Sequence, residues 1–213
     1  MEITWYGLSC FRMVERGFAN VITDPFDHQK TGFRPLQLTA DIVTISHDAP
    51  GHNYLEAVTG TPYIISGPGE YEVGGVFITG IQTGGQRGSD QSRNTLYVFD
   101  FDSLTVAHLG DLDRVLTQAE VEEMGTINIA MVPVGGGGGL NAARAAEVIG
   151  MLEPNIVIPM HYAAPEGKIP LESLSKFLKE MGISEARTQP SFKIVKNALS
   201  EEMQVIVLDE QRI

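Results

Sequence analysis

The first half of the chain alternates between short apolar runs and polar turns, a pattern typical of short strands. Glycine, proline and aspartate interrupt these runs, and no long helical stripe is present before residue 110. The pattern predicts only a brief helix at 54–58, loops at 27–40 and 83–92, and a hairpin turn at Asp102-Ser103. Strands are expected at residues 2–6, 10–14, 18–23, 41–46, 62–66, 70–73, 76–81, 94–101 and 104–108.

The second half alternates between helices and strands. Glu120 lies three residues after Thr117, which predicts a capping box at the start of a helix. Asn141 is expected to cap a second helix, and an apolar stripe that ends at Gly182 predicts a third. The helices are expected at 118–124, 141–152 and 171–181, and the strands at 127–134, 156–160, 192–195 and 204–208. A strand-rich half followed by strand–helix units predicts an α/β fold of two packed sheets with helices outside, in one domain over residues 1–213.

Charge and cysteine content narrow the classes of partner. The chain has 213 residues and a net charge of −12, which argues against nucleic acid or an anionic membrane as its main partner. Cys10 is the only cysteine, so no internal disulfide can form and a cytoplasmic location is expected. We also expect no signal peptide, because Met1 leads directly into a strand pattern. The expected partner is a small-molecule substrate or anion, and the sequence does not indicate the oligomeric state.

Two histidines lie on the polar turn that follows the strand at 41–46. His47 and His52 are five residues apart, and a helix is expected to begin soon after them. Imidazoles at the end of a buried strand, on a turn that exposes them, suit a metal site at a sheet edge. A turn that merely kept this fold without binding metal is the alternative.

Four segments together resemble the metallo-β-lactamase superfamily. His47 and His52 match the outer positions of its His-x-His-x-Asp-His turn, where Ala49 and Gly51 replace the inner ligands. The run from His108 to Asp111 resembles its His-x-Gly-Asp segment, and the run that ends at His161 resembles its last metal-binding strand. The opening segments Trp5–Phe11 and Val21–Pro25 are similar to those of the branch near the ascorbate-6-phosphate lactonase-like Zn-dependent hydrolases. That branch usually carries His where this chain has Leu8.

The resemblance implies a four-layer αββα sandwich of the metallo-β-lactamase type, with a site at one edge between the sheets. It implies the metal ligands His47, His52, Asp111 and His161, with Asp111 and His161 also catalytic. Of the family's two zinc sites, one would keep only His47 and Asp111, whereas the other would keep His52, Asp111 and His161. One ion at most is therefore expected, as zinc, or as iron or manganese.

The sequence is compatible with two functions. The first is a metal-dependent hydrolase with a reduced metal site, acting on a lactone, amide or phosphate ester. The second is a non-catalytic relative that binds a small anion or a protein partner in the same cleft. The glycine run 135–139 could cradle an anion or be a flexible loop. Asp24 is expected to order the histidine turn, and His108 to be a buried partner rather than a ligand.

Overall fold

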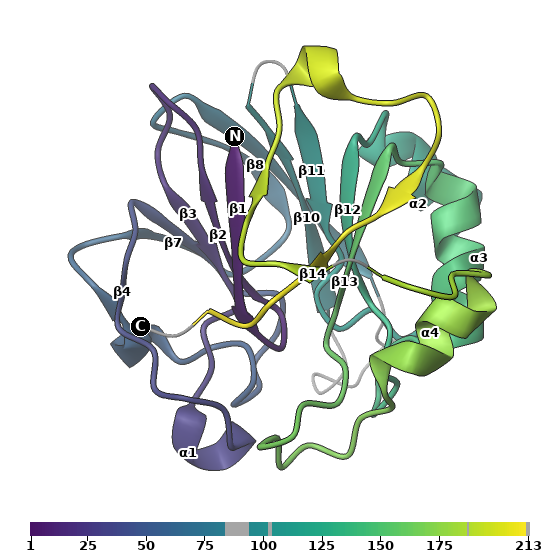
Figure 1. Cartoon of the computed structure of the whole chain (residues 1–213). Coiled ribbons are helices and arrows are strands. Elements are labelled where there is room, and N and C mark those ends of the chain that lie inside the picture. Colours follow the sequence, from purple (N-terminus) through teal and green to yellow (C-terminus); the bar gives the residue numbers. More distant parts are fainter. Residues whose placement is uncertain (84–93, 102–103, 187, 212–213) are drawn as a thin grey trace.

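Two β-sheets face each other, and three helices lie on the outer side of the second sheet (Figure 1). This computed structural model describes residues 1–83, 94–101, 104–186 and 188–211. The arrangement confirms the expected α/β sandwich fold. The predicted turn at Asp102-Ser103 and all of the predicted 83–92 loop except Thr83 lie outside the described residues.

The first sheet comes mainly from the start of the chain. Its six strands have the order β15-β1-β2-β3-β5-β7. Their bounds are β1 Glu2–Gly7, β2 Cys10–Val14, β3 Val21–Thr23, β5 Ile42–Thr44, β7 Tyr63–Ile65 and β15 Phe192–Lys193. β3 is shorter than predicted, because Ala19 turns away to donate its N–H to Gly74 O. β3, β5 and β7 run parallel, so the segments that follow them leave the sheet at the same edge.

The second sheet has seven strands in the order β16-β13-β12-β11-β10-β9-β8. Their bounds are β8 Gly69–Val73, β9 Val76–Thr83, β10 Asn94–Asp100, β11 Thr105–His108, β12 Ile129–Pro133, β13 Ile156–Met160 and β16 Gln204–Val205. β11, β12, β13 and β16 are parallel, whereas β8 to β11 pair antiparallel. The carboxyl ends of β11, β12 and β13 therefore meet at one edge, and that edge carries Asp111, the glycine run and His161.

The helices α2, α3 and α4 cover the outer face of the second sheet (Figure 1). Their bounds are α2 Gln118–Met124, α3 Ala142–Leu152 and α4 Leu174–Glu180. The capping box is confirmed: Thr117 Oγ1 accepts from Glu120 N, and Glu120 Oε2 accepts from Thr117 N at 2.7 Å. Asn141 caps α3 as predicted, by accepting from Arg144 N. α4 begins later than predicted, because Glu172 N instead donates to Gly135 O and holds that segment extended.

Short elements correct two predictions about the connections. Residues 27–40 are not all loop: Asp27 accepts from Gln29 N and caps a one-turn helix that ends at Gly32, where φ is 83°. The helix expected at 54–58 is a 3₁₀ turn followed by a strand. The remaining bounds are α1 His28–Thr31, β4 Leu38–Thr39, η1 Leu55–Ala57, β6 Val58–Thr59, β14 Thr188–Gln189, η3 Lys196–Ala198 and β17 Val207–Leu208.

Alternation along the first sheet produces two apolar clusters. Inward residues such as Ile3 and Phe11 pack in the main core with the second sheet. Outward residues such as Leu8 and Cys10 pack in a smaller cluster with Phe26 and its neighbours from the α1 segment. Cys10 is fully buried there. Among the described residues, no helix has the length and apolar character needed to cross a membrane.

Candidate metal centre

Asp24 organises the turn that carries the two histidines. It follows β3 and has a φ of 39°, and its side chain is fully buried. Its carboxylate accepts from Ser46 N at 2.7 Å and from Ser46 Oγ at 2.6 Å, and it lies 2.7 Å from His52 Nδ1. Asp24 therefore orders the histidine turn, as the sequence led us to expect.

The same contact orients the imidazole of His52. Because Nδ1 is held by Asp24, Nε2 is the nitrogen left to bind a metal, an arrangement common among metal-binding histidines. Burial acts to lower the pKa of His52, but the Asp24 carboxylate raises it above its usual value. The ring of His47 lies beside that of His52, with 4.1 Å between their centroids. Burial and the neighbouring His52 lower the pKa of His47 to about 4.

Asp111 reaches the histidines from the other sheet. It stands on the turn after β11, where Gly110 has a φ of 59° and Asp111 N donates to Asn94 Oδ1 at 2.9 Å. Burial raises the pKa of the Asp111 carboxyl. His47, His52 and Asp111 each offer a ligand atom, and these atoms all lie within 4.8 Å of one another. Two imidazole nitrogens and one carboxylate oxygen are a donor set that suits zinc, iron or manganese.

His161 stands directly beside this group, at the end of β13. Its Nδ1 lies 3.5 Å from Asp111 Oδ1, and its ring centroid is 5.2 Å from that of His52. The side chain is 4 % exposed, and burial, together with His52, lowers the pKa of His161 to about 3. The imidazole is therefore neutral near pH 7, and its contact with Asp111 is not an ion pair.

Two buried polar atoms at this site test whether a metal ion fits. Asp111 Oδ1 and His161 Nδ1 have no hydrogen-bond partner in the part of the chain that the structure describes. Buried polar atoms usually have partners, and those without one often mark the place of an ion or water. The two atoms lie 3.5 Å apart and belong to residues beside His47 and His52, so the residues present fit a bound cation.

All four predicted ligands thus converge, although the closest group of three differs from the predicted one. The predicted set was His52, Asp111 and His161, whereas His47 takes the place of His161 in the tightest cluster. The turn explains this: His52 N and Asn53 N both donate to Ala49 O, which folds His52 back against His47.

The substituted positions Ala49 and Gly51 have different surroundings. Ala49 is half-buried on the turn, whereas Gly51 is buried. A Cβ at Gly51 would lie 3.5 Å from Leu8 Cδ1 and 3.8 Å from Ile169 Cδ1, so position 51 is surrounded by apolar side chains. Asp48 does not replace a lost ligand, because it is exposed and accepts from Asn53 Nδ2.

The glycine run has a role that neither of its predicted interpretations covered. A Cβ on Gly139 would collide with Asp111 Oδ1, and a Cβ on Gly135 would collide with His161 O. These glycines allow the segment after β12 to lie directly against two of the predicted ligands. The signal in the sequence was the glycine run itself, but only the packing shows what it accommodates.

The other histidines lie outside the centre. His108 is buried at the end of β11, and its Nε2 lies 2.9 Å from Ser9 O, which supports the prediction of a buried partner. His28 lies on α1. Sequence reasoning missed Ser46, whose hydroxyl lies 3.2 Å from His47 Nδ1, and Asn94. Polar residues at strand ends are common, and no local pattern distinguished these two.

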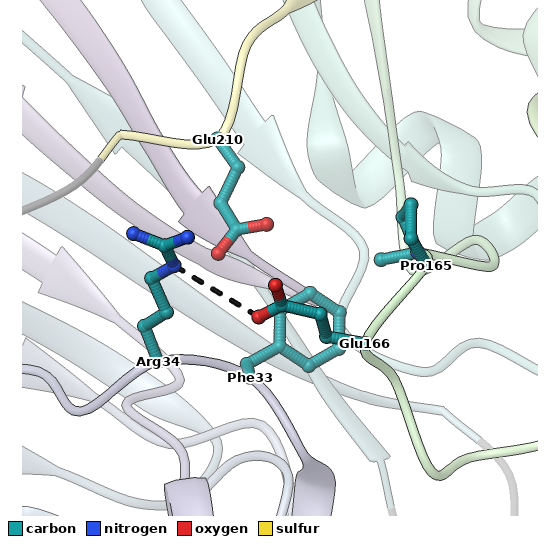
Figure 2. Close-up of a pocket in the computed structure, with 6 residues that line it drawn as sticks. Phe33, Arg34, Pro165, Glu166 and Glu210 are labelled. Atoms are coloured by element: carbon teal, nitrogen blue, oxygen red, sulfur yellow. Dashed lines mark ion pairs between the residues drawn. The ribbon is translucent and has the colours of Figure 1, made fainter.

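A separate small pocket lies near the α1 segment (Figure 2). It has a volume of about 120 Å³ and lies between the loop after α1, the segment after β13 and Glu210. Arg34 Nε points across it toward Glu166 Oε2 at 3.9 Å (Figure 2). None of the predicted ligands lines it, so this pocket is distinct from the metal centre. Its lining residues are Phe33, Arg34, Ala164, Pro165, Glu166 and Glu210.

Comparisons with known proteins point to one family. Residues 2–161 match the model of the beta-lactamase superfamily domain. A UPF0173 metal-dependent hydrolase of Natranaerobius thermophilus is 31% identical over 188 residues, which cover 76% of this chain and 83% of that protein. Its counterpart in Thermococcus onnurineus is 26% identical over 193 residues, 76% of this chain and 84% of that protein. A crystal structure of a metallo-beta-lactamase superfamily protein from Thermotoga maritima has a TM-score of 0.81. It is 35% identical and covers 97% of both chains.

Proposed function

The chain belongs to the metallo-β-lactamase superfamily, and we propose that it is a hydrolase that depends on a single bound metal ion. The observation that carries the proposal is the group formed by His47, His52 and Asp111, whose ligand atoms lie within 4.8 Å of one another. The similarity to metal-dependent hydrolases over most of the chain supports the same conclusion.

The chain's own residues would divide the work at this centre. His47, His52 and Asp111 would hold the ion, with Asp24 fixing the ring of His52 so that Nε2 faces it. A bound divalent ion would supply Lewis acidity and lower the pKa of a water molecule toward neutrality. His161 is neutral and its Nδ1 is without a partner in the described chain, so it could complete the ligand set or accept a proton at Nδ1.

We further propose that the centre is mononuclear. The side chains of Ala49 and Gly51 offer no metal ligand, and a Cβ at position 51 would contact the apolar side chains of Leu8 and Ile169. The resemblance would place a further histidine ligand within residues 81–86, and the sequence of that segment contains no histidine. The proposed metal is zinc, with iron or manganese compatible with the same donors. The proposed substrates are lactones, amides or phosphate esters.

Metal content and metal binding test this proposal. Protein purified without chelator should contain close to one equivalent of zinc, iron or manganese by elemental analysis. His47→Ala and His52→Ala should each lower the affinity of the metal-free protein for Zn²⁺ strongly, whereas the control His28→Ala should not, because His28 lies on α1 outside the centre. A parent protein that binds none of these ions would overturn the proposal.

Hydrolysis is tested separately on the loaded protein. A panel with one chromogenic lactone, one anilide and one phosphodiester would identify the bond class, and activity should disappear on chelation. The replacement of two family ligands by Ala49 and Gly51 favours the alternative of a non-catalytic binding protein. That alternative predicts no turnover in the panel together with binding of an anion, for which calorimetry with inorganic phosphate is the direct measurement.

A further inference from the structure

Asn94 occupies the first position of β10, where it reaches the turn that carries Asp111. Asn94 is only 6 % exposed, so its side-chain amide needs hydrogen-bond partners within the protein. We infer that Asn94 is a positioning residue that sets the place of the Asp111 carboxylate relative to the histidines. The inference rests on the proposed function, because it assumes that Asp111 is a metal ligand.

The amide of Asn94 holds both ends of the Asp111 turn. Nδ2 donates to Leu109 O at 3.0 Å, and Oδ1 accepts from Asp111 N at 2.9 Å. Nδ2 also donates to Thr83 Oγ1 at 3.0 Å, which anchors the side chain to the end of β9. Both amide hydrogens and the oxygen are thus engaged, so the orientation of the group is fixed. The hydrogen bonds to Leu109 O and from Asp111 N therefore fix the backbone from Leu109 to Asp111.

Close packing restricts the same turn from the other side. A Cβ on Gly110 would collide with Asn94 Oδ1 and with Ser46 Cβ. Thr95 N, next to Asn94 in β10, donates to Ser46 O at 2.8 Å. The Asp111 turn therefore lies directly against both Asn94 and Ser46, with no room for a side chain between them.

Ser46 links this contact to the histidines. Its hydroxyl donates to Asp24 Oδ2 at 2.6 Å and lies 3.2 Å from His47 Nδ1. The histidine turn belongs to the first sheet, whereas Asn94 and Asp111 belong to the second. Asn94 thus holds the Asp111 turn against Ser46, which also contacts Asp24 and His47. The distance between the Asp111 carboxylate and the two histidines therefore depends on Asn94.

Asn128 provides a matched control at the opposite end of the same sheet. It precedes β12, its Oδ1 accepts from Thr105 N at 3.0 Å, and its Nδ2 donates to Asn155 Oδ1 at 3.2 Å. Like Asn94, it uses its amide to join neighbouring strands, but it touches none of the proposed ligands. A purely structural role for Asn94 predicts that the two residues behave alike.

The test compares Asn94→Ala with Asn128→Ala in the full chain. The Zn²⁺ affinity of the metal-free protein is measured by chelator competition. The visible absorption bands of the Co²⁺ form report the geometry of the ligands, and urea unfolding reports stability. We expect Asn94→Ala to lower Zn²⁺ affinity by about 10–100-fold, the range for residues that orient metal ligands, and to change the Co²⁺ bands. Asn128→Ala should shift the unfolding midpoint but keep Zn²⁺ affinity within about twofold of the parent, because it leaves the donors in place.

A second variant protects the test against loss of folding. Asn94→Ser retains a polar side chain and should also weaken Zn²⁺ binding. Its side chain is one heavy atom shorter and replaces two separate amide atoms, which reach Leu109 O and Asp111 N, with a single oxygen. Parental affinity and Co²⁺ bands in both folded variants would overturn the inference and leave the proposed function standing. An equal loss of affinity in Asn128→Ala would also overturn it. A parent that binds neither ion would overturn both proposals.

Discussion

His52 Nδ1 lies 2.7 Å from Asp24 Oδ2, so a carboxylate at the end of β3 sets the orientation of an imidazole 28 residues later. Both side chains are buried, and the carboxylate also accepts two hydrogen bonds from Ser46. Partners of this kind usually fix which nitrogen of a histidine binds metal.

Asp24→Asn should weaken metal binding without removing a ligand. The amide keeps the size of the side chain but loses the negative charge that orients His52, so Zn²⁺ affinity should fall by about 10–100-fold. Asp27→Asn is the matched control, because Asp27 caps α1 and asparagine caps helices equally well. Competition titration of both variants decides the point, and equal affinities would show that Asp24 has no influence on the centre.

Gly139→Ala should disturb Asp111 directly. The added Cβ would collide with Asp111 Oδ1, so the carboxylate must move and Zn²⁺ affinity should drop by at least about tenfold, as for other changes that misplace a ligand. Gly150→Ala on α3 makes the same chemical change with no heavy atom within 4 Å. It should stabilise the protein by about 0.5–1 kcal/mol, because alanine favours helix over glycine. Unchanged Zn²⁺ affinity in folded Gly139→Ala would contradict the assignment of Asp111 as a ligand.

Gly51→Asp should cost stability. A surface turn would accept the change for under about 0.5 kcal/mol, but Gly51 is buried against Leu8 and Ile169. A carboxylate placed there without a partner should lower the free energy of unfolding by about 1–3 kcal/mol in the metal-free protein. Gly51→Ala should be nearly neutral, since its Cβ would make only ordinary contacts. Urea unfolding of both variants measures the difference, and equal midpoints would show that the position is effectively solvated.

Glu120→Gln should make stability less dependent on pH in the acid range. Two hydrogen bonds from Arg114 lower the pKa of Glu120 to about 2. Burial acts in the opposite direction, and hydrogen bonds from Thr117 lower the pKa further. Because the folded pKa lies below the unfolded value of about 4.3, the pair stabilises the fold above that pH and loses its effect as pH falls toward 2. Arg114 is partly exposed, so we expect the variant to be less stable by about 1 kcal/mol at pH 7.

Urea midpoints of the parent and Glu120→Gln should therefore converge as pH falls from about 5 to about 2. Glu172→Gln is the control, because its ion pair with Lys176 is exposed and should contribute less than about 0.5 kcal/mol. A gap between parent and Glu120→Gln that stayed constant with pH would show that the charge of Glu120 is not what stabilises this turn.

Local patterns in the sequence determined the strands, the helix caps and the positions that carry chemistry. Thr117 with Glu120, and Asn141, begin their helices where predicted, because capping involves only neighbours along the chain. The predicted ligands converge because each follows a strand whose end lies at the same edge of the sandwich. The family resemblance supplied the order of the strands in the two sheets, and that order predicted that these strand ends would lie close together.

Tertiary structure alone decided how these residues meet. It grouped His47 with His52 and Asp111, buried Gly51, and placed Asn94 against the Asp111 turn. Each of these contacts joins segments that are far apart in the sequence, so no local pattern of polarity or propensity encodes it. The geometry of the centre therefore depends on packing between the two sheets, which is where Ser46 and Asn94 act.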